Sequence, residues 1–110
     1  MKLPNADKAR VDKTKITEYL LNKSHPDGCS KASFFCQFGF TLENWEIFAQ
    51  SLCRHAKSHN VTKVVESKYG TRYSIDGYLE TPDGRNPEVR SIWITEKQST
   101  IPRLITVHPK

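Results

Sequence analysis

The apolar residues change their period once, after Asn60, and this change constrains the fold more than any other feature. Before it, apolar side chains recur at helical spacing, as in the run from Leu42 to Ala56. After it, branched and aromatic residues alternate with polar ones between glycine and proline turns. A block of helices followed by a block of strands predicts an α+β domain.

Three helices are predicted before the change of period, each from a capping residue and an apolar stripe. They cover residues 13–22, residues 31–38 and about four turns from residue 42, with Asp12, Ser30 and Thr41 as their N-caps. Pro26 prevents the first helix from continuing, and Gly39 suits the left-handed end of the second. Residues 1–11 are expected to form an extended lead-in, and residues 12–59 the helical part.

Four strands are predicted in residues 60–109, at residues 61–67, 71–81, 88–95 and 102–107. The turn signal at residues 82–87 is the strongest in the chain, and Gly77 is expected to mark a bulge. The predicted fold is therefore α+β, a single domain over residues 1–110 with three N-terminal helices packed on a four-stranded antiparallel sheet.

Alternation along the strands predicts which side chains line the sheet face that the helices leave open. Ile92 and Ile94 are expected to face the helices, so that the more polar set on their strand faces outward. The predicted open face contains Arg72, Ser74, Val89, Ser91, Trp93, Thr95, Leu104 and Thr106. A shift of register by one residue, or a bulge, would reverse these assignments.

Composition limits the possible partners and compartments. The 110 residues carry a formal net charge of +5 at a pI near 9.2, which permits an anionic partner without requiring one. The three cysteines form no Cys-x-x-Cys pair, which favours a reducing compartment over a disulfide framework. No apolar run is long enough to span a bilayer, and the first residues do not read as a secretory signal.

Several runs resemble a family of small bacterial domains of unknown function, over nearly the whole chain. These runs include His25-Pro26, Lys31-Ala32, residues 69–73, residues 81–84, Ile92-Trp93 and residues 102–107. More distantly, helices that lead into an antiparallel sheet ending in residues 104–107 are similar to the barnase, EndoU, colicin and RelE class of ribonuclease folds. Many bacterial toxins have folds of this class.

The second resemblance implies metal-free cleavage of RNA, in which the ribose 2′-hydroxyl attacks the adjacent phosphate and leaves a cyclic phosphate. His25 is then the expected acid or base, because its ordinary pKa is closest to neutrality. Lys31 and Arg72 would hold the phosphate, and Thr106 would donate a hydrogen bond to it. A second set, Tyr73, Ser74 and Trp93, is predicted to contact the substrate, with an aromatic face for a splayed base. No cofactor and no metal are expected.

Each of these residues also has a structural interpretation. His25 could cap the carbonyl groups of the preceding helix, and Arg72 could pair with Glu66 or Glu80 across strands. Lys31 could be a solvated residue, Thr106 a strand former and Trp93 a core residue. The spacings His25-x-x-x-Cys29 and His55-x-x-x-His59 would also suit zinc, but no glutamate follows His55 as in zinc hydrolases.

Two functions of different class are therefore compatible with the sequence. The first is a ribonuclease toxin that acts on RNA and is held by an acidic antitoxin or immunity protein. Such a toxin would work in the cytoplasm, or be delivered to a target cell's cytoplasm as part of a longer chain. The second is a non-catalytic basic module that docks a protein partner or nucleic acid on its open sheet face.

Overall fold

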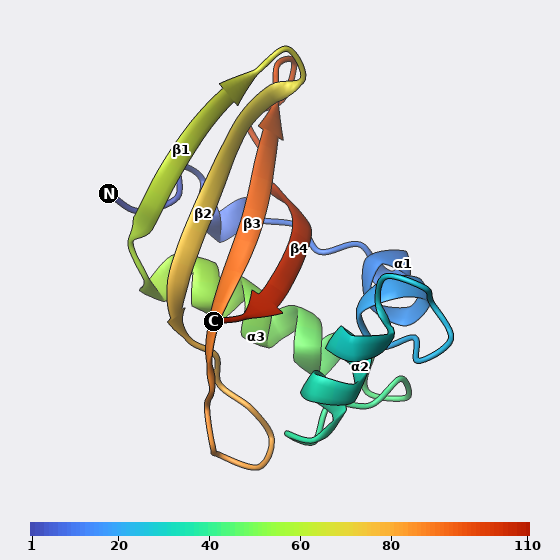
Figure 1. The fold of residues 1–110 in the computed structure, drawn as a ribbon. Coiled ribbons are helices and arrows are strands. Elements are labelled where there is room, and N and C mark those ends of the chain that lie inside the picture. The colour runs from blue at the N-terminus through green and yellow to red at the C-terminus, as the bar shows by residue number, and fades with distance from the viewer.

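The computed structural model describes residues 1–110 and contains a four-stranded antiparallel sheet preceded by helices (Figure 1). The helical segments are η1 Ala6–Lys8, α1 Lys13–Lys15, η2 Ile16–Leu20, α2 Cys29–Cys36 and α3 Trp45–Ser58. The strands are β1 Val61–Ser67, β2 Gly70–Tyr78, β3 Glu88–Glu96 and β4 Arg103–Pro109, hydrogen-bonded in the order β1-β2-β3-β4. The predicted α+β class and antiparallel meander are confirmed.

Only one helix covers a sheet face, which corrects the predicted arrangement. Helix α3 lies behind the strands in Figure 1 and buries Phe48, Leu52 and Ala56 against them. Segments α1 and α2 instead contact β4 and lie beyond that edge of the sheet. The physical reason is length, because α3 has 14 residues and an apolar stripe along one side, whereas α2 has only eight.

The helix boundaries differ from those predicted by a few residues. The first helix is one α turn followed by a π turn, Ile16–Leu20, and its last two predicted residues are not helical. Helix α2 begins at Cys29, so Ser30 lies inside it and is not its cap. Thr41 accepts the Asn44 amide at 3.1 Å and closes a turn, and α3 begins only after that turn.

The predicted faces of β3 were reversed. Val89, Ser91 and Trp93 are 0% exposed and lie on the helix side, whereas Ile92 and Ile94 lie on the open side. The prediction was wrong because it took the more polar set to be solvated. The hydroxyl of Ser91 is in fact buried with two hydrogen-bond partners, so its polarity does not require water.

A bulge in β4 reverses the predicted side of Leu104. Ile92 pairs with Thr106, but Trp93 pairs with Leu104, which leaves Ile105 without a partner. Leu104 therefore faces the helices and is 2% exposed, whereas Thr106 stays on the open side as predicted.

Gly77, the predicted bulge, is paired regularly in β2. It has another reason to be glycine, because the His59 ring occupies the place of a side chain there.

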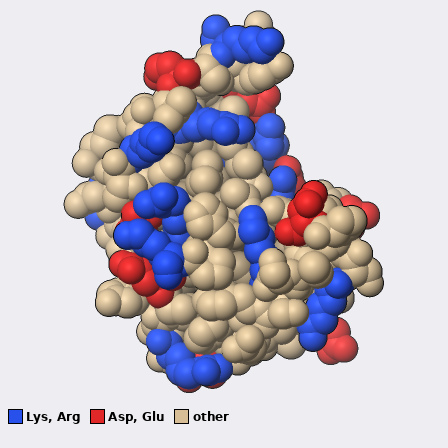
Figure 2. All heavy atoms as spheres, in the orientation of Figure 1, with Lys and Arg blue, Asp and Glu red and all other residues tan.

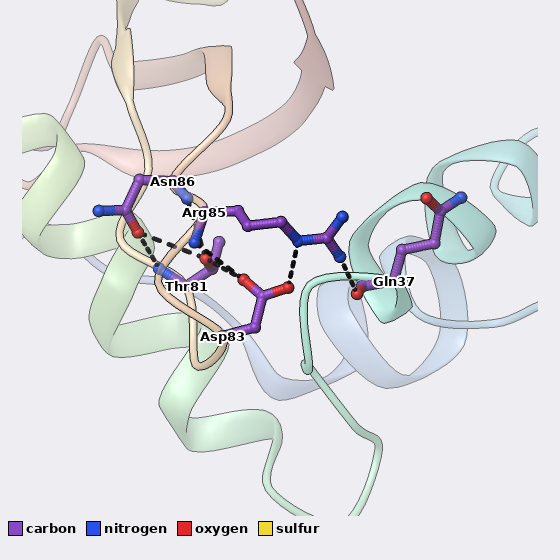
Figure 3. Close-up of polar contacts among 5 residues, drawn as sticks. All are labelled: Gln37, Thr81, Asp83, Arg85 and Asn86. Carbon is purple, nitrogen blue, oxygen red and sulfur yellow. Dashed lines mark hydrogen bonds and ion pairs between the residues drawn. The ribbon is translucent and has the colours of Figure 1, made fainter.

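The loop between β2 and β3 holds the end of α2 in place (Figure 3). The Arg85 guanidinium donates a hydrogen bond to the Gln37 carbonyl at 2.6 Å and pairs with Asp83, also at 2.6 Å. The same guanidinium lies 4.5 Å from the centre of the Phe38 ring. This turn, predicted from its proline and glycine residues, thus fixes the helix that carries Lys31.

The lead-in packs against β4. The Arg10 amide donates to the Pro102 carbonyl and the Arg10 carbonyl accepts the Leu104 amide, both at 2.9 Å. Leu3 is 3% exposed in the core, and the segment is extended apart from the η1 turn. No helix of the chain is long and apolar enough to cross a membrane.

Candidate functional site

Three polar side chains from three different elements meet beside the outer edge of β4. The Lys31 Nζ donates to the Tyr19 hydroxyl at 2.7 Å and to the Thr106 hydroxyl at 2.8 Å, and these two hydroxyls are 3.3 Å apart. All three residues are half-buried, and Lys31 forms no ion pair with a carboxylate. We call Tyr19, Lys31 and Thr106 the edge cluster.

Local backbone features bring the edge cluster together. The π turn of η2 carries Tyr19, and Lys31 lies in the first turn of α2. Gly28 is buried between them, where a side chain would collide with the carbonyl oxygen and ring of Tyr19. Glycine at this position therefore allows α2 to begin directly against Tyr19. The bulge in β4 leaves Thr106 on the open side of the sheet, toward Lys31.

His25 borders the edge cluster and also caps a turn. Its Nδ1 accepts the backbone amides of Asp27 and Gly28 at 2.9 and 3.0 Å, and its ring packs edge-on to Tyr19 with 5.0 Å between centroids. The capping prediction was thus wrong in its detail, because the imidazole binds amides before α2 and not carbonyls of the preceding helix. Since Nδ1 is an acceptor here, the ring proton lies on Nε2.

The electrostatics of the edge cluster lower the pKa of the Tyr19 phenol. Burial raises the pKa of Tyr19, but the hydrogen bonds from Lys31 and Thr106 and the charges of Lys31 and Lys15 outweigh it, so the pKa is lowered overall. The ammonium groups of Lys15 and Lys31 also lie 5.5 and 5.1 Å from the centre of the Tyr19 ring. The cluster therefore concentrates positive potential at one hydroxyl.

A second histidine lies on the same side of the sheet, two residues after Thr106. Burial lowers the pKa of His108, and the charges of Lys31 and Arg90 lower it further, against the opposing effect of Asp76. This imidazole is thus neutral at pH 7 and able to accept a proton.

An ion network next to His108 joins Arg90, Asp76 and Lys110. Arg90 binds Asp76 through two hydrogen bonds of 2.7 and 2.9 Å, and Lys110 approaches the same carboxylate at 3.3 Å. The hydrogen bond from Arg90, with Lys110, lowers the pKa of Asp76 to about 2, although burial opposes this shift.

The remaining predicted site residues lie on both sides of the sheet. Ser74 shares a row with Ile92 and Thr106, and Arg72 lies in the adjacent row, two strands and roughly 10 Å from β4. Arg72 pairs with neither Glu66 nor Glu80: Thr71 binds the first of these carboxylates and Arg54 the second. The open face therefore offers Arg72 as an unpaired cation.

The structure places both aromatic residues predicted to contact substrate on the helix side of the sheet. Trp93 is fully buried and donates its indole N–H to Ser91 at 2.8 Å. Tyr73 pairs with Trp93 in the ladder and packs against the core on the same side. Both aromatic rings thus lie on the face opposite to Arg72, because the pleat that turns Arg72 outward turns its neighbour Tyr73 inward.

Of the two histidines whose spacing would suit zinc, His55 instead forms hydrogen bonds inside the core. Both ring nitrogens of His55 are engaged, Nδ1 with Ser91 at 3.0 Å and Nε2 with the Gly77 carbonyl at 3.1 Å. No group of three or more histidine, cysteine or acidic side chains is arranged to hold a metal ion.

Sequence reasoning missed Tyr19 and His108. Tyr19 lies within the first predicted helix but was not among the candidate site residues, and the predicted fourth strand ended at residue 107, although it continues to Pro109. A signal for His108 was present, because residues two apart in a strand share a face and Thr106 was already a candidate. Nothing in the spacing of Tyr19 signals the π turn that carries its hydroxyl to Lys31.

The chain matches a described protein family along almost its whole length. Residues 2–110 match the model of a family described as "Domain of unknown function (DUF6883)". The chain belongs to this family. The resemblance predicted from the sequence to a family of small domains of unknown function is thereby confirmed.

One solved structure carries the same fold. It is a chain of the "Contact-dependent growth inhibition toxin - immunity protein complex from Klebsiella pneumoniae 342", with a TM-score of 0.74 and 22% sequence identity. The alignment covers 91% of the present chain and 98% of that chain. The likeness shows that the two chains share an architecture over nearly their full length. No curated protein sequence matches the chain.

Proposed function

We propose that this domain is a metal-independent endoribonuclease that acts as a bacterial toxin. The observation that carries the proposal is the edge cluster, in which two neutral hydroxyls hold the Lys31 ammonium on the open side of the sheet without a carboxylate. An ammonium in this state is a ready anion site. The fold supports the proposal, since a chain of a toxin–immunity protein complex shares it.

The edge cluster would bind the scissile phosphate. An ammonium has three N–H donors, and Lys31 gives two of them to Tyr19 and Thr106, so that the third is left for a phosphate oxygen. Arg72, also on the open face, supplies a second cation farther along the RNA. Donors fixed in this way need no reorganisation when charge builds up on the phosphorane.

Tyr19 and His108, whose pKa values are both lowered, would transfer the protons. Neutral His108 takes the proton of the ribose 2′-hydroxyl, whose oxygen forms a bond to phosphorus. The bond from phosphorus to the 5′-oxygen breaks, and Tyr19 gives its proton to that oxygen. The tyrosinate is stabilised by Lys31, which explains why the lowered pKa of Tyr19 is useful. Products are a 2′,3′-cyclic phosphate and a 5′-hydroxyl.

The acid–base role predicted for His25 stays a prediction, and its contacts favour a different part in the reaction. Its Nδ1 would lose two backbone hydrogen bonds on taking a proton. In the proposed mechanism, His25 holds the Tyr19 ring and offers its Nε2–H to a phosphate oxygen.

An acidic antitoxin or immunity protein is the proposed partner. The domain carries a formal net charge of +5, and charge complementarity accelerates the capture of an enzyme that would otherwise damage its host. The neighbour's description as a complex with an immunity protein supports this arrangement. The proposed place of action is the cytoplasm, reached directly or after delivery as part of a longer chain.

The test is cleavage of purified bacterial RNA by the domain and its Lys31→Ala, Thr106→Val and His108→Ala variants. Lys97→Ala removes the same charge from the exposed β3–β4 connection and serves as the control. We expect the control to retain cleavage and the three variants to lose most of it at unchanged melting temperature. Equal cleavage by all variants, or none by the wild type, contradicts the proposal.

One observation favours the second candidate, a non-catalytic binding module. The histidine that the sequence singled out for proton transfer is engaged with backbone amides, as in a structural turn. A wild-type domain that binds RNA or an acidic protein but cleaves no RNA would favour this function.

A further inference from the structure

A hollow opens on the uncovered face of the sheet, near the tip of the β1–β2 hairpin. Its volume is about 540 Å³. Val65, Ile94 and Ile105 supply apolar side chains to it, and Tyr69 and Arg72 also line it. We call it the tip hollow. None of its lining residues belongs to the edge cluster, so it is a separate feature of the same face.

The tip hollow combines an apolar surface with an exposed aromatic ring. Val65 is 41% exposed and Tyr69 67% exposed, although both are large and apolar enough to be costly in water. The bulge in β4 turns Ile105 into the hollow and so enlarges its apolar surface. Planar bases bind to such platforms, because every base has an apolar face that stacks on a tyrosine ring.

Of the charged residues that line the tip hollow, Arg103 and Glu96 pair with each other, which leaves Arg72 free for an anion. The Arg72 guanidinium has no carboxylate partner, and Lys63, in the next row of the same face, has none either. Figure 2 shows Lys and Arg side chains distributed over the molecule's face in this orientation, with tan surface between them. Separate cations with apolar surface between them suit a strand of alternating phosphates and bases, which favours a nucleic acid over an acidic peptide.

Ladder register places the tip hollow next to the edge cluster. The row that contains Arg72, Ile94 and Arg103 adjoins the row that contains Ile92 and Thr106. Two residues of strand separate these rows along β3, which is roughly 7 Å. Arg72 also lies two strands, roughly 10 Å, across from Thr106, so the two residues are roughly 12 Å apart and about two nucleotides of an extended strand span them.

We propose that the tip hollow is a nucleobase subsite for single-stranded RNA, with the base stacked on Tyr69 and its phosphate held by Arg72. A phosphate about two nucleotides along the same strand then lies at Lys31. The choice of RNA as the ligand rests on the proposed function, but binding in the tip hollow does not require that the domain cleaves what it binds.

The experiment measures binding, so that catalysis and the subsite are tested apart. A fluorescent RNA octamer and an octamer of abasic nucleotides with the same number of phosphates are titrated with the Lys31→Ala protein at low salt. Stacking contributes about 1–3 kcal/mol per base, so we expect the abasic strand to bind about tenfold more weakly. Adding Tyr69→Ala should reduce that difference to less than threefold.

A matched control separates this result from a general loss of aromatic surface. Tyr78 is 66% exposed at the other end of β2, and Tyr78→Ala should leave the tenfold difference intact. A Val65→Asp variant, which places a charge against the base, should act like Tyr69→Ala. Equal binding of the two octamers, or equal weakening of both by Tyr69→Ala, overturns the proposal. If the wild type cleaves no RNA while the difference is observed, the subsite stands and the proposed catalysis falls.

Discussion

Two polar clusters lie on opposite sides of the sheet, and they differ in how completely their hydrogen bonds are used. The buried cluster consists of His55, Ser91 and Trp93, and the edge cluster of Tyr19, Lys31 and Thr106. In the first, Trp93 donates to Ser91, Ser91 donates to His55, and His55 donates to the Gly77 carbonyl. In the second, a charged donor has one N–H to spare and stands at the surface.

The difference teaches what each cluster is able to do. In the buried cluster, the side chains are 2% exposed or less and their hydrogen bonds form a closed, neutral chain. Such a chain adds specificity to a core and has no free donor or acceptor for a ligand. An unpaired ammonium that is only half-buried retains its attraction for anions. Four measurements would break or sharpen this contrast, beginning with the largest expected effect.

Removing the central ring of the buried cluster should cost the most. His55→Ala leaves the Ser91 hydroxyl and the Gly77 carbonyl without a partner and opens a cavity, so we expect the free energy of unfolding to fall by about 4 kcal/mol. Urea denaturation measures this. His59→Ala, whose imidazole meets the Tyr78 carbonyl at the surface, is the matched control and should cost less than half as much. Equal losses would show that the buried cluster is not the stabilising one.

Lys31→Ala should lower the rate of RNA cleavage strongly and the free energy of unfolding only slightly. Loss of one preorganised donor to the phosphorane typically lowers the rate 100- to 1,000-fold, about 3–4 kcal/mol, and we expect a loss of that size in kcat/KM for RNA cleavage. Its free energy of unfolding should change by less than about 1 kcal/mol, since the side chain is only half-buried. A variant that unfolds as readily as His55→Ala would place Lys31 among the structural residues.

Acid should act on the buried cluster first. Burial lowers the pKa of His55 to about 4, from 6.5 in the unfolded chain, so the folded state excludes a proton that the unfolded state accepts. The corresponding stability is complete above pH 6.5 and is lost as the pH falls toward 4. It amounts to roughly 3 kcal/mol. Urea melts of the wild type between pH 7 and pH 4 measure it, and the fall should shrink in His55→Ala.

The smallest effect concerns the phenol of the edge cluster. The pKa of Tyr19 is lowered by Lys31, so Lys31→Met should raise it, and a titration of tyrosinate absorbance should show one group moving to higher pH. Tyr19→Phe removes that group from the titration and identifies it. It should also reduce RNA cleavage about 100-fold, the low end for a proton donor. An unchanged titration in Lys31→Met would contradict the contact between the two side chains.

Much of the fold follows from local patterns. The first strand was predicted at its observed bounds, and the other three within a few residues, because alternation and turn residues mark strands directly. Gly39 has φ 101°, the left-handed conformation expected at the end of α2. The candidate site was predicted in part, since Lys31 and Thr106, 75 residues apart in sequence, are in contact.

By itself, the sequence determined the order of helices and strands, the turns between them and the chemical types available on them. Only the tertiary structure decided which face of β3 is buried, because Ser91 is satisfied there by His55, a partner 36 residues away. The tertiary structure alone also brings the Tyr19 hydroxyl to Lys31, because a π turn carries Tyr19 and Gly28 allows α2 to begin directly against it. Periodicity is a local property, whereas hydrogen-bond satisfaction and close packing depend on segments that meet only when the chain is folded.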